Sequence, residues 1–145
     1  MTTEPSICTV GRLDHVGIAV VNIEEALAVF RRLLDAPDAS IIEAPDRGLR
    51  AAFIAQGQTR IELLQPTNPD SSLSRFVAQR GGGLHHIAFQ VDDIEAKLAQ
   101  LQEMEVPLVD TVPRQGFSGM IAFLRPEAVN QVLVELVQPP KPQTP

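Results

Sequence analysis

The chain has 145 residues, of which 44% are hydrophobic and 21% charged, as expected for one soluble globular domain or for two small fused modules. A net charge of −6 and the absence of Trp and Tyr disfavour a nucleic-acid surface, and no apolar run is long enough to cross a bilayer. The single cysteine, Cys8, excludes an internal disulfide and fits a reducing cytoplasm. We therefore expect a cytoplasmic protein with neither a nucleic-acid nor a membrane partner.

The first predicted module covers about residues 10–65 and follows a loose leader, residues 1 to about 10. Its elements are a strand over 13–20, a helix from Asn22, a short strand over 40–44, a turn over 45–48 and a hairpin of strands over 49–55 and 58–64. Asn22 and Glu25 resemble a capping box at the start of the helix. The predicted order is thus β-α-β-β-β.

The second predicted module covers residues 84–138 and repeats this order after a linker, residues 66–83. The linker is expected to hold a short helix over 73–79. The elements of the module are a strand over 84–91, a helix capped by Asp93, a strand over 106–112, a loop over 113–118 and a hairpin of strands over 119–124 and 131–137. The proline-rich tail, residues 139–145, cannot continue a sheet and is expected to be disordered or extended. Residues 1–145 are therefore expected to form a single domain of two modules.

The two modules begin with the same pattern. His15 and Asn22 in the first module correspond to His86 and Asp93 in the second, with the same spacing. Duplicated modules place equivalent side chains about a shared axis, so the two histidines are expected to meet. A core histidine would be the ordinary explanation for either alone. Each histidine, however, shares its strand face with small residues, which leaves space. These small residues are Gly17, Ala19 and Ala88.

The last strands of the modules also repeat, and each carries a glutamate among large aliphatic residues: Glu62 and Glu135. An unpaired buried carboxylate costs several kcal/mol, and an outward solvated glutamate would account for one of the two but fits poorly with both. Two imidazoles and two carboxylates without a thiolate favour a site for one divalent transition metal. The predicted ligands are His15, Glu62, His86 and Glu135. This set suits Co, Ni, Mn, Fe or Zn and does not choose among them.

The runs that carry these residues resemble the vicinal oxygen chelate superfamily and, within it, the methylmalonyl-CoA epimerases. The runs are residues 13–20, 61–66 with Asp70 and Ser71 after them, 83–89 and 132–136. The resemblance implies an α+β fold in which two tandem β-α-β-β-β modules form a curved, incompletely closed eight-stranded mixed sheet around one metal site. It also implies cobalt first among the divalent metals, with Ni, Mn, Zn or Fe as alternatives, and it allows a homodimer.

The resemblance also distinguishes between two neighbouring histidines. Relatives with one histidine keep the residue directly before Ile-Ala-Phe, so His86 is the expected ligand and His85 a strand-end or pocket-edge residue. The chain departs from the family pattern in three places. Ala51 stands where some epimerases have a glutamate base, and Arg125, in Phe-Leu-Arg-Pro, stands where the family has a histidine. Asn130 and Gln131 stand where the family has paired glycines.

The implied activity is the interconversion of (R)- and (S)-methylmalonyl-CoA by proton transfer at one carbon through a metal-stabilised enolate. Gly17, Ala19 and Ala88 would leave room for the compact acyl group of this acyl-CoA partner. Because Ala51 cannot act as a base, Glu62 and Glu135 are the expected catalytic residues. The alternative is that both glutamates are only ligands and that another acid or a water transfers the proton.

Two further functions remain open for the same fold. One is a glyoxalase I-like lyase that acts on a glutathione hemithioacetal and uses the same four ligands. The other is a non-catalytic small-molecule binding protein, which would commonly lack those ligands. A metal-dependent dioxygenase is disfavoured because such sites usually use three protein ligands.

Overall fold

The computed structural model describes residues 9–141, and their contacts divide them into two compact units. The continuous unit is residues 15–86, and the discontinuous unit joins residues 9–14 to residues 87–141. Strands β1 (Val10–Ala19) and β5 (Gly83–Val91) contribute to both units, because the boundaries fall next to His15 and His86. Each unit therefore includes a piece of strand that belongs, by sequence, to the other module.

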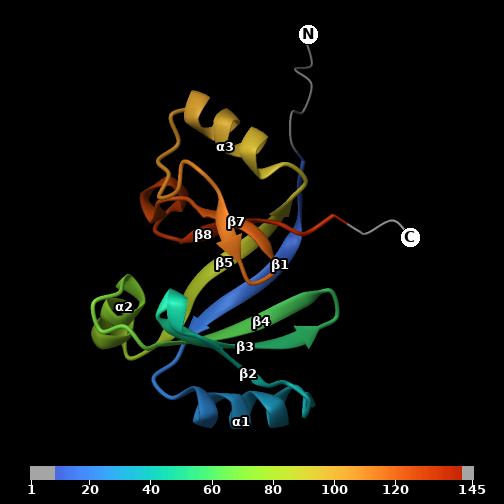
Figure 1. The fold of residues 1–145 in the computed structure, drawn as a ribbon, viewed down its shortest axis with the longest axis vertical. Helices are drawn as coiled ribbons and strands as arrows, with labels where there is room; N and C mark the ends of the chain where they lie inside the picture. Colours follow the sequence, from blue (N-terminus) through green and yellow to red (C-terminus); the bar gives the residue numbers. More distant parts are fainter. Residues whose placement is uncertain (1–8, 142–145) are drawn as a thin grey trace. The chain divides into compact units, whose positions relative to one another are not determined.

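The continuous unit contains the remaining elements of the first module and the linker helix. They are α1 (Ile23–Leu33), β2 (Ile41–Ala44), a 3-10 turn (Pro45–Arg47), β3 (Leu49–Gln56), β4 (Thr59–Pro66) and α2 (Ser72–Arg80). The strand order is β2-β3-β4-β1, with β1 parallel to β4 and the other neighbours antiparallel. Helix α1 packs against this sheet (Figure 1), and Ile23, Leu27 and Leu63 are buried between them.

The discontinuous unit contains the second module. Its elements after β5 are α3 (Ile94–Glu103), β6 (Arg114–Gly116), β7 (Gly119–Phe123), a 3-10 turn (Pro126–Val129) and β8 (Val134–Gln138). The strand order is β5-β8-β7-β6, with β5 parallel to β8 and the other neighbours antiparallel. Helix α3 packs on this sheet through Ile94 and Leu98 (Figure 1). Both modules have the predicted β-α-β-β-β order, with mixed strand pairing.

Two equivalent side-chain hydrogen bonds stabilise the first turn of α1 and the first turn of α3. In α1, the side chain of Asn22 accepts a hydrogen bond from the backbone N–H three residues later, and the side chain of Gln65 accepts one from the N–H of Ile23 at 2.8 Å. In α3, Asp93 and Gln138 have the same two roles. The N–H groups of a first helical turn have no partner within the helix, so each acceptor satisfies one of them. The predicted caps are confirmed, and each glutamine ties the end of a strand to a helix.

The second module differs from the prediction where a strand was expected over residues 106–112. That segment makes one isolated bridge, between Leu108 and Leu124, and no strand. The strand that pairs with β7 is instead β6, inside residues 113–118, which were expected to form a loop. Pro107 lacks an N–H to donate to a neighbouring strand, so the apolar residues around it cannot continue a ladder.

The connection from β7 to β8 contains two residues with left-handed backbone conformations. Asn130 has φ 52° and Gln131 has φ 69°. These are the positions at which the family pattern has paired glycines, which adopt such angles without steric cost. The side chains present here make the turn more costly, by about 1 kcal/mol for a residue in this region.

The ends of the chain lie partly outside the described residues. β1 begins at Val10, three residues before the strand predicted over residues 13–20, and residues 1–8 of the expected leader are outside the description. Residues 139–141 of the expected tail contain neither helix nor strand, and residues 142–145 are outside the description. Within residues 9–141, every helix is too short or too polar to span a membrane.

Candidate metal centre

Three of the four predicted ligands come together in the continuous unit. Nε2 of His15, on β1, lies 3.1 Å from Nε2 of His86, at the start of β5. Oε1 of Glu62, on β4, lies 3.5 Å from Nε2 of His15 and 3.2 Å from Nε2 of His86. The two histidines therefore meet, as the repeat predicts.

The spacing and chemistry of these donor atoms fit one transition-metal ion. A circle through the three atoms has a radius of about 1.9 Å, whereas imidazole and carboxylate ligands bind such ions at about 2.0–2.2 Å. These three atoms could therefore hold one such ion together. The side chains of His15, Glu62 and His86 are buried, with residue exposures of 4–5%. The nitrogen and oxygen donors suit a divalent transition metal.

Gly17 makes room for one of these predicted ligands. A Cβ atom on Gly17 would lie 2.1 Å from Cε1 and 2.4 Å from Nδ1 of the His86 ring. The space beside Gly17 is therefore filled by imidazole. This corrects the expectation that small residues leave room for an acyl group, because Ala19 and Ala88 are also buried, at 1% and 0% exposure.

His85 lies beside the metal-facing atoms. Its Nδ1 is 2.9 Å from Nδ1 of His86, and its ring packs edge-to-face on Phe76 with the centroids 4.9 Å apart. It is Nε2 of His86 that approaches His15 and Glu62, as the sequence repeat predicts.

An aromatic ring and a cation flank the three predicted ligands. Phe53 lies directly across from Glu62 on β3, and its ring is edge-on to His15 with the centroids 6.3 Å apart. Cζ of Arg60 lies 4.5 Å from the centroid of the Phe53 ring, within cation–π range. Alternate residues of a strand share a face, so Arg60 and Glu62 lie on the same face of β4. A half-buried guanidinium is thus part of the ligand face.

Glu135 has an equivalent environment in the discontinuous unit. It lies on β8 between Ala88 of β5 and Phe123 of β7, just as Glu62 lies across from Phe53. Cζ of Arg114 lies 5.4 Å from the centroid of the Phe123 ring. Each module therefore presents a glutamate across from a phenylalanine that contacts an arginine.

Burial picks out the same positions. Among residues 9–141, the buried polar or charged side chains are those of the four predicted ligands and of Asp14. Sequence reasoning missed Asp14, which is 6% exposed and accepts a hydrogen bond from Nε2 of Gln90 at 2.8 Å. A carboxylate directly before a ligand histidine in an apolar strand was the available signal.

Ala51 occupies the strand position at which some epimerases have a glutamate. It is fully buried and lies across from Leu64, two residues along β4 from Glu62, so it belongs to the ligand face. Alternation along the described strands of the continuous unit leaves Glu62 as the carboxylate on that face. The ligand face of the continuous unit therefore lacks the additional glutamate that some epimerases have at the position of Ala51.

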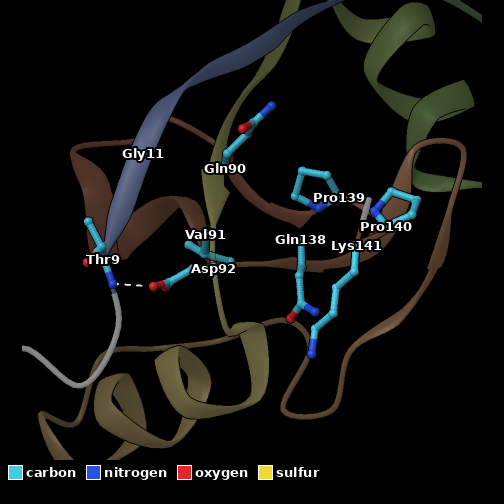
Figure 2. A pocket seen from close by; sticks show the side chains of 9 residues that line it. All are labelled: Thr9, Gly11, Gln90, Val91, Asp92, Gln138, Pro139, Pro140 and Lys141. Carbon is cyan, nitrogen blue, oxygen red and sulfur yellow. Dashed lines mark hydrogen bonds between the residues drawn. The ribbon is translucent and has the colours of Figure 1, made fainter. Parts of the chain in front are cut away.

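A groove of about 490 Å³ lies elsewhere, in the discontinuous unit (Figure 2). Its polar side chains take part in the fold: Asp92 accepts a hydrogen bond from the backbone N–H of Thr9 at 3.0 Å, and Gln138 accepts one from Ile94 at 2.9 Å. None of the four predicted ligands lines this groove.

Comparisons with known proteins agree with the fold. The family model described as "Glyoxalase/Bleomycin resistance protein/Dioxygenase superfamily" matches residues 14–124. The ethylmalonyl-CoA/methylmalonyl-CoA epimerase of Cereibacter sphaeroides is 38% identical over 132 residues, which are 89% of this chain and 98% of the relative. The chain belongs to the methylmalonyl-CoA epimerase family of this superfamily.

Solved structures of the family have the same fold. The crystal structure of methylmalonyl-CoA epimerase from Mycobacterium tuberculosis matches with a TM-score of 0.83 and 31% identity, over 96% of this chain and 93% of that chain. A methylmalonyl-CoA epimerase in complex with methylmalonyl-CoA and NH4+ matches with a TM-score of 0.84 and 30% identity, over 94% of this chain and 100% of that chain. The predicted fold class and the resemblance to the epimerase family are confirmed.

Proposed function

We propose that this protein is a metal-dependent epimerase that interconverts (R)- and (S)-methylmalonyl-CoA by removing and returning the proton at C2. The observation that carries the proposal is the buried cluster of His15, Glu62 and His86 in a member of the methylmalonyl-CoA epimerase family. Ethylmalonyl-CoA is the second substrate to test, because the name of one relative includes it.

Glu135 is the proposed fourth ligand. Its support is its repeat-equivalence to Glu62, its 5% exposure in an apolar strand and its position across from Phe123. A buried carboxylate is costly unless a cation or hydrogen-bond donors compensate it, and a shared divalent ion would do so. We propose cobalt as the ion, with Ni, Mn, Zn or Fe able to occupy the same donors.

A bound divalent ion supplies positive charge that stabilises the enolate oxygen during proton abstraction next to a thioester. His15 and His86 would hold that ion through neutral imidazoles in a buried site. Glu62 and Glu135 are the proposed proton-transfer residues, one for each face of C2. Arg60 brings a second cation to the ligand face of β4, which suits the negative charge of a malonyl-type acyl group.

Two alternatives are set aside on specific grounds. A glyoxalase I-like lyase has the same ligand types, but the relatives at 35–38% identity named for an activity are epimerases. A non-catalytic binding protein gives no reason for three ligand groups that converge within 3.5 Å in a buried site. We further propose a cytoplasmic homodimer, on the family resemblance and on the lone Cys8.

The test is isotope exchange at C2. Purified protein reconstituted with Co²⁺ is incubated with methylmalonyl-CoA in deuterated water, and C2 deuteration and the enantiomer ratio are followed. We expect deuterium incorporation together with racemisation, and no net redox or ring-cleaving chemistry. Parallel assays use ethylmalonyl-CoA and the hemithioacetal of methylglyoxal and glutathione. Turnover of the hemithioacetal without exchange in methylmalonyl-CoA would assign the protein to the lyases.

A further inference from the structure

We propose that His85 is a positioning residue that sets the tautomer of His86, so that Nε2 of His86 keeps its lone pair for the metal ion. The inference rests on the metal site of the proposed function, but not on the substrate or on the reaction catalysed there.

The short distance between the two neighbouring histidines indicates a hydrogen bond between their Nδ1 atoms. Nδ1 of His85 and Nδ1 of His86 are 2.9 Å apart, so one of these nitrogens carries the hydrogen and the other accepts it. A neutral imidazole has a single N–H, and a metal binds the ring nitrogen that lacks it. Nε2 of His86 faces His15 and Glu62, so it is the nitrogen that would bind a metal ion, and the hydrogen of His86 then belongs on Nδ1. His86 is then the donor, and His85 is a neutral acceptor with its own hydrogen on Nε2.

The orientation of both rings is restrained as well. Phe76 packs edge-to-face on His85 at 85°, which limits rotation of the accepting ring. The backbone of Gly17 lies against the His86 ring, so this ring has little freedom to turn away from His85. Ligand histidines usually donate their second N–H to a carboxylate, a backbone carbonyl or water, and this partner typically accounts for 10–100-fold in metal affinity. In this protein the partner is another imidazole.

Two acceptors compete for the hydrogen of His86 before metal binds. Oε1 of Glu62 lies 3.2 Å from Nε2 of His86 and favours a hydrogen on that nitrogen, whereas Nδ1 of His85, at 2.9 Å, favours a hydrogen on Nδ1. His85 therefore acts against Glu62 and keeps Nε2 of His86 ready for the metal ion.

Two substitutions separate hydrogen bonding from packing. In His85→Asn, the side-chain oxygen can take the place of Nδ1 as an acceptor, whereas His85→Leu keeps similar bulk without an acceptor. We expect His85→Leu to weaken Co²⁺ binding by about 10–100-fold in calorimetric titrations, and His85→Asn to stay within about threefold of the wild type. Thermal melts followed by circular dichroism verify that both variants fold.

A second readout does not depend on metal or activity. Long-range ¹H–¹⁵N spectra of histidine-labelled, metal-free protein should show His86 with its hydrogen on Nδ1. In His85→Leu, the His86 signals should shift towards a mixture of tautomers. The inference is overturned by a wild-type His86 with its hydrogen on Nε2, by a His85→Leu protein that binds Co²⁺ as the wild type does, or by a His85→Asn protein as weak as His85→Leu. Failure of epimerisation alone would count against the proposed function and leave these comparisons intact.

Discussion

Because Gly17 has no side chain, the His86 ring has space in the candidate metal centre. In Gly17→Ala, the added methyl group would overlap the His86 ring, whose Cε1 lies 2.1 Å from the ideal Cβ position. We expect the ring to be displaced from His15 and Glu62 and the affinity for Co²⁺ to fall by roughly tenfold or more, because the donor atoms lose their spacing. Calorimetric titration measures the loss.

Gly11→Ala is the matched control for this substitution. Gly11 lies on the same strand, but a Cβ atom there would make only ordinary contacts, the nearest at 3.5 Å to the carbonyl of Gln90. The control should bind Co²⁺ as the wild type does. Equal affinities for Gly17→Ala and the wild type would show that the His86 ring is not held as described.

The two glutamates allow a test of the proton-transfer residues. Glu62→Gln and Glu135→Gln keep the shape of each side chain but remove the basic carboxylate. If each glutamate serves one face of C2, each variant should lose epimerisation by roughly 10²–10⁴-fold, the usual contribution of a general base. At least one variant should still exchange the C2 proton of a single enantiomer. Chiral analysis after incubation in deuterated water distinguishes the two activities.

Metal content must be measured in both glutamine variants, since each change also removes a proposed ligand. Variants that hold metal and epimerise at near wild-type rates would contradict the two-base assignment. The proton would then come from another acid or from water, with both glutamates acting only as ligands.

The two glutamines at the ends of β4 and β8 offer a prediction at the scale of whole elements. Gln65→Ala and Gln138→Ala each leave a first-turn N–H without its side-chain acceptor, at Ile23 of α1 and Ile94 of α3. Each substitution should lower the free energy of unfolding by about 1 kcal/mol. Urea denaturation measures both, and the similar half-buried settings of the two glutamines predict similar losses.

Gln102→Ala is the control for these two variants. Its side chain is exposed on α3, and alanine is the best helix former, so the substitution should leave stability unchanged or slightly higher. A loss of stability on substitution of only one of the two strand-end glutamines would show that this hydrogen bond does not stabilise both modules.

The elements that sequence predicted well are those whose signals are local. The helix caps depend on residues three apart, and the strands that carry the histidines contain short apolar runs. The error over residues 106–112 has a different origin, because its apolar pattern is interrupted by Pro107 and its backbone follows a loop. β6 has the sequence Arg-Gln-Gly, with no strand pattern, and exists through its pairing with β7. Pairing partners far along the chain cannot be identified from such a short segment.

At the scale of the whole molecule, the duplicated ligand pattern predicts one metal ion per chain. Elemental analysis of metal-reconstituted protein should give about one equivalent, as expected for a single tetradentate site. His86→Ala should abolish tight binding, because it removes a ligand from the buried cluster. His85→Ala should weaken binding without abolishing it.

Two results would contradict this prediction. Two equivalents of tightly bound metal per chain would mean that each module holds its own ion. Complete loss of metal in His85→Ala with retention in His86→Ala would mean that the neighbouring histidines have exchanged roles.

The repeat predicted which side chains lie together, but not their surroundings. His15, Glu62 and His86 were identified because equivalent residues recur in both modules, and their contacts in the continuous unit match the prediction. The burial of Asp14 and the contact between the two neighbouring imidazoles have no counterpart elsewhere in the repeat. Such features depend on packing within one unit and leave no duplicated signal.

The missing side chain at position 17 sets a limit on attempts to make the protein more symmetrical. Its counterpart in the second module is Ala88, so averaging the two repeats into one consensus could place alanine at both positions. Alanine generally favours regular structure over glycine, so such a redesigned chain would be expected to fold with all four predicted ligands present. The methyl group at position 17 would nevertheless keep the His86 ring away from the other ligands. The two modules must therefore differ at this position if His15 and His86 are to bind the same metal ion.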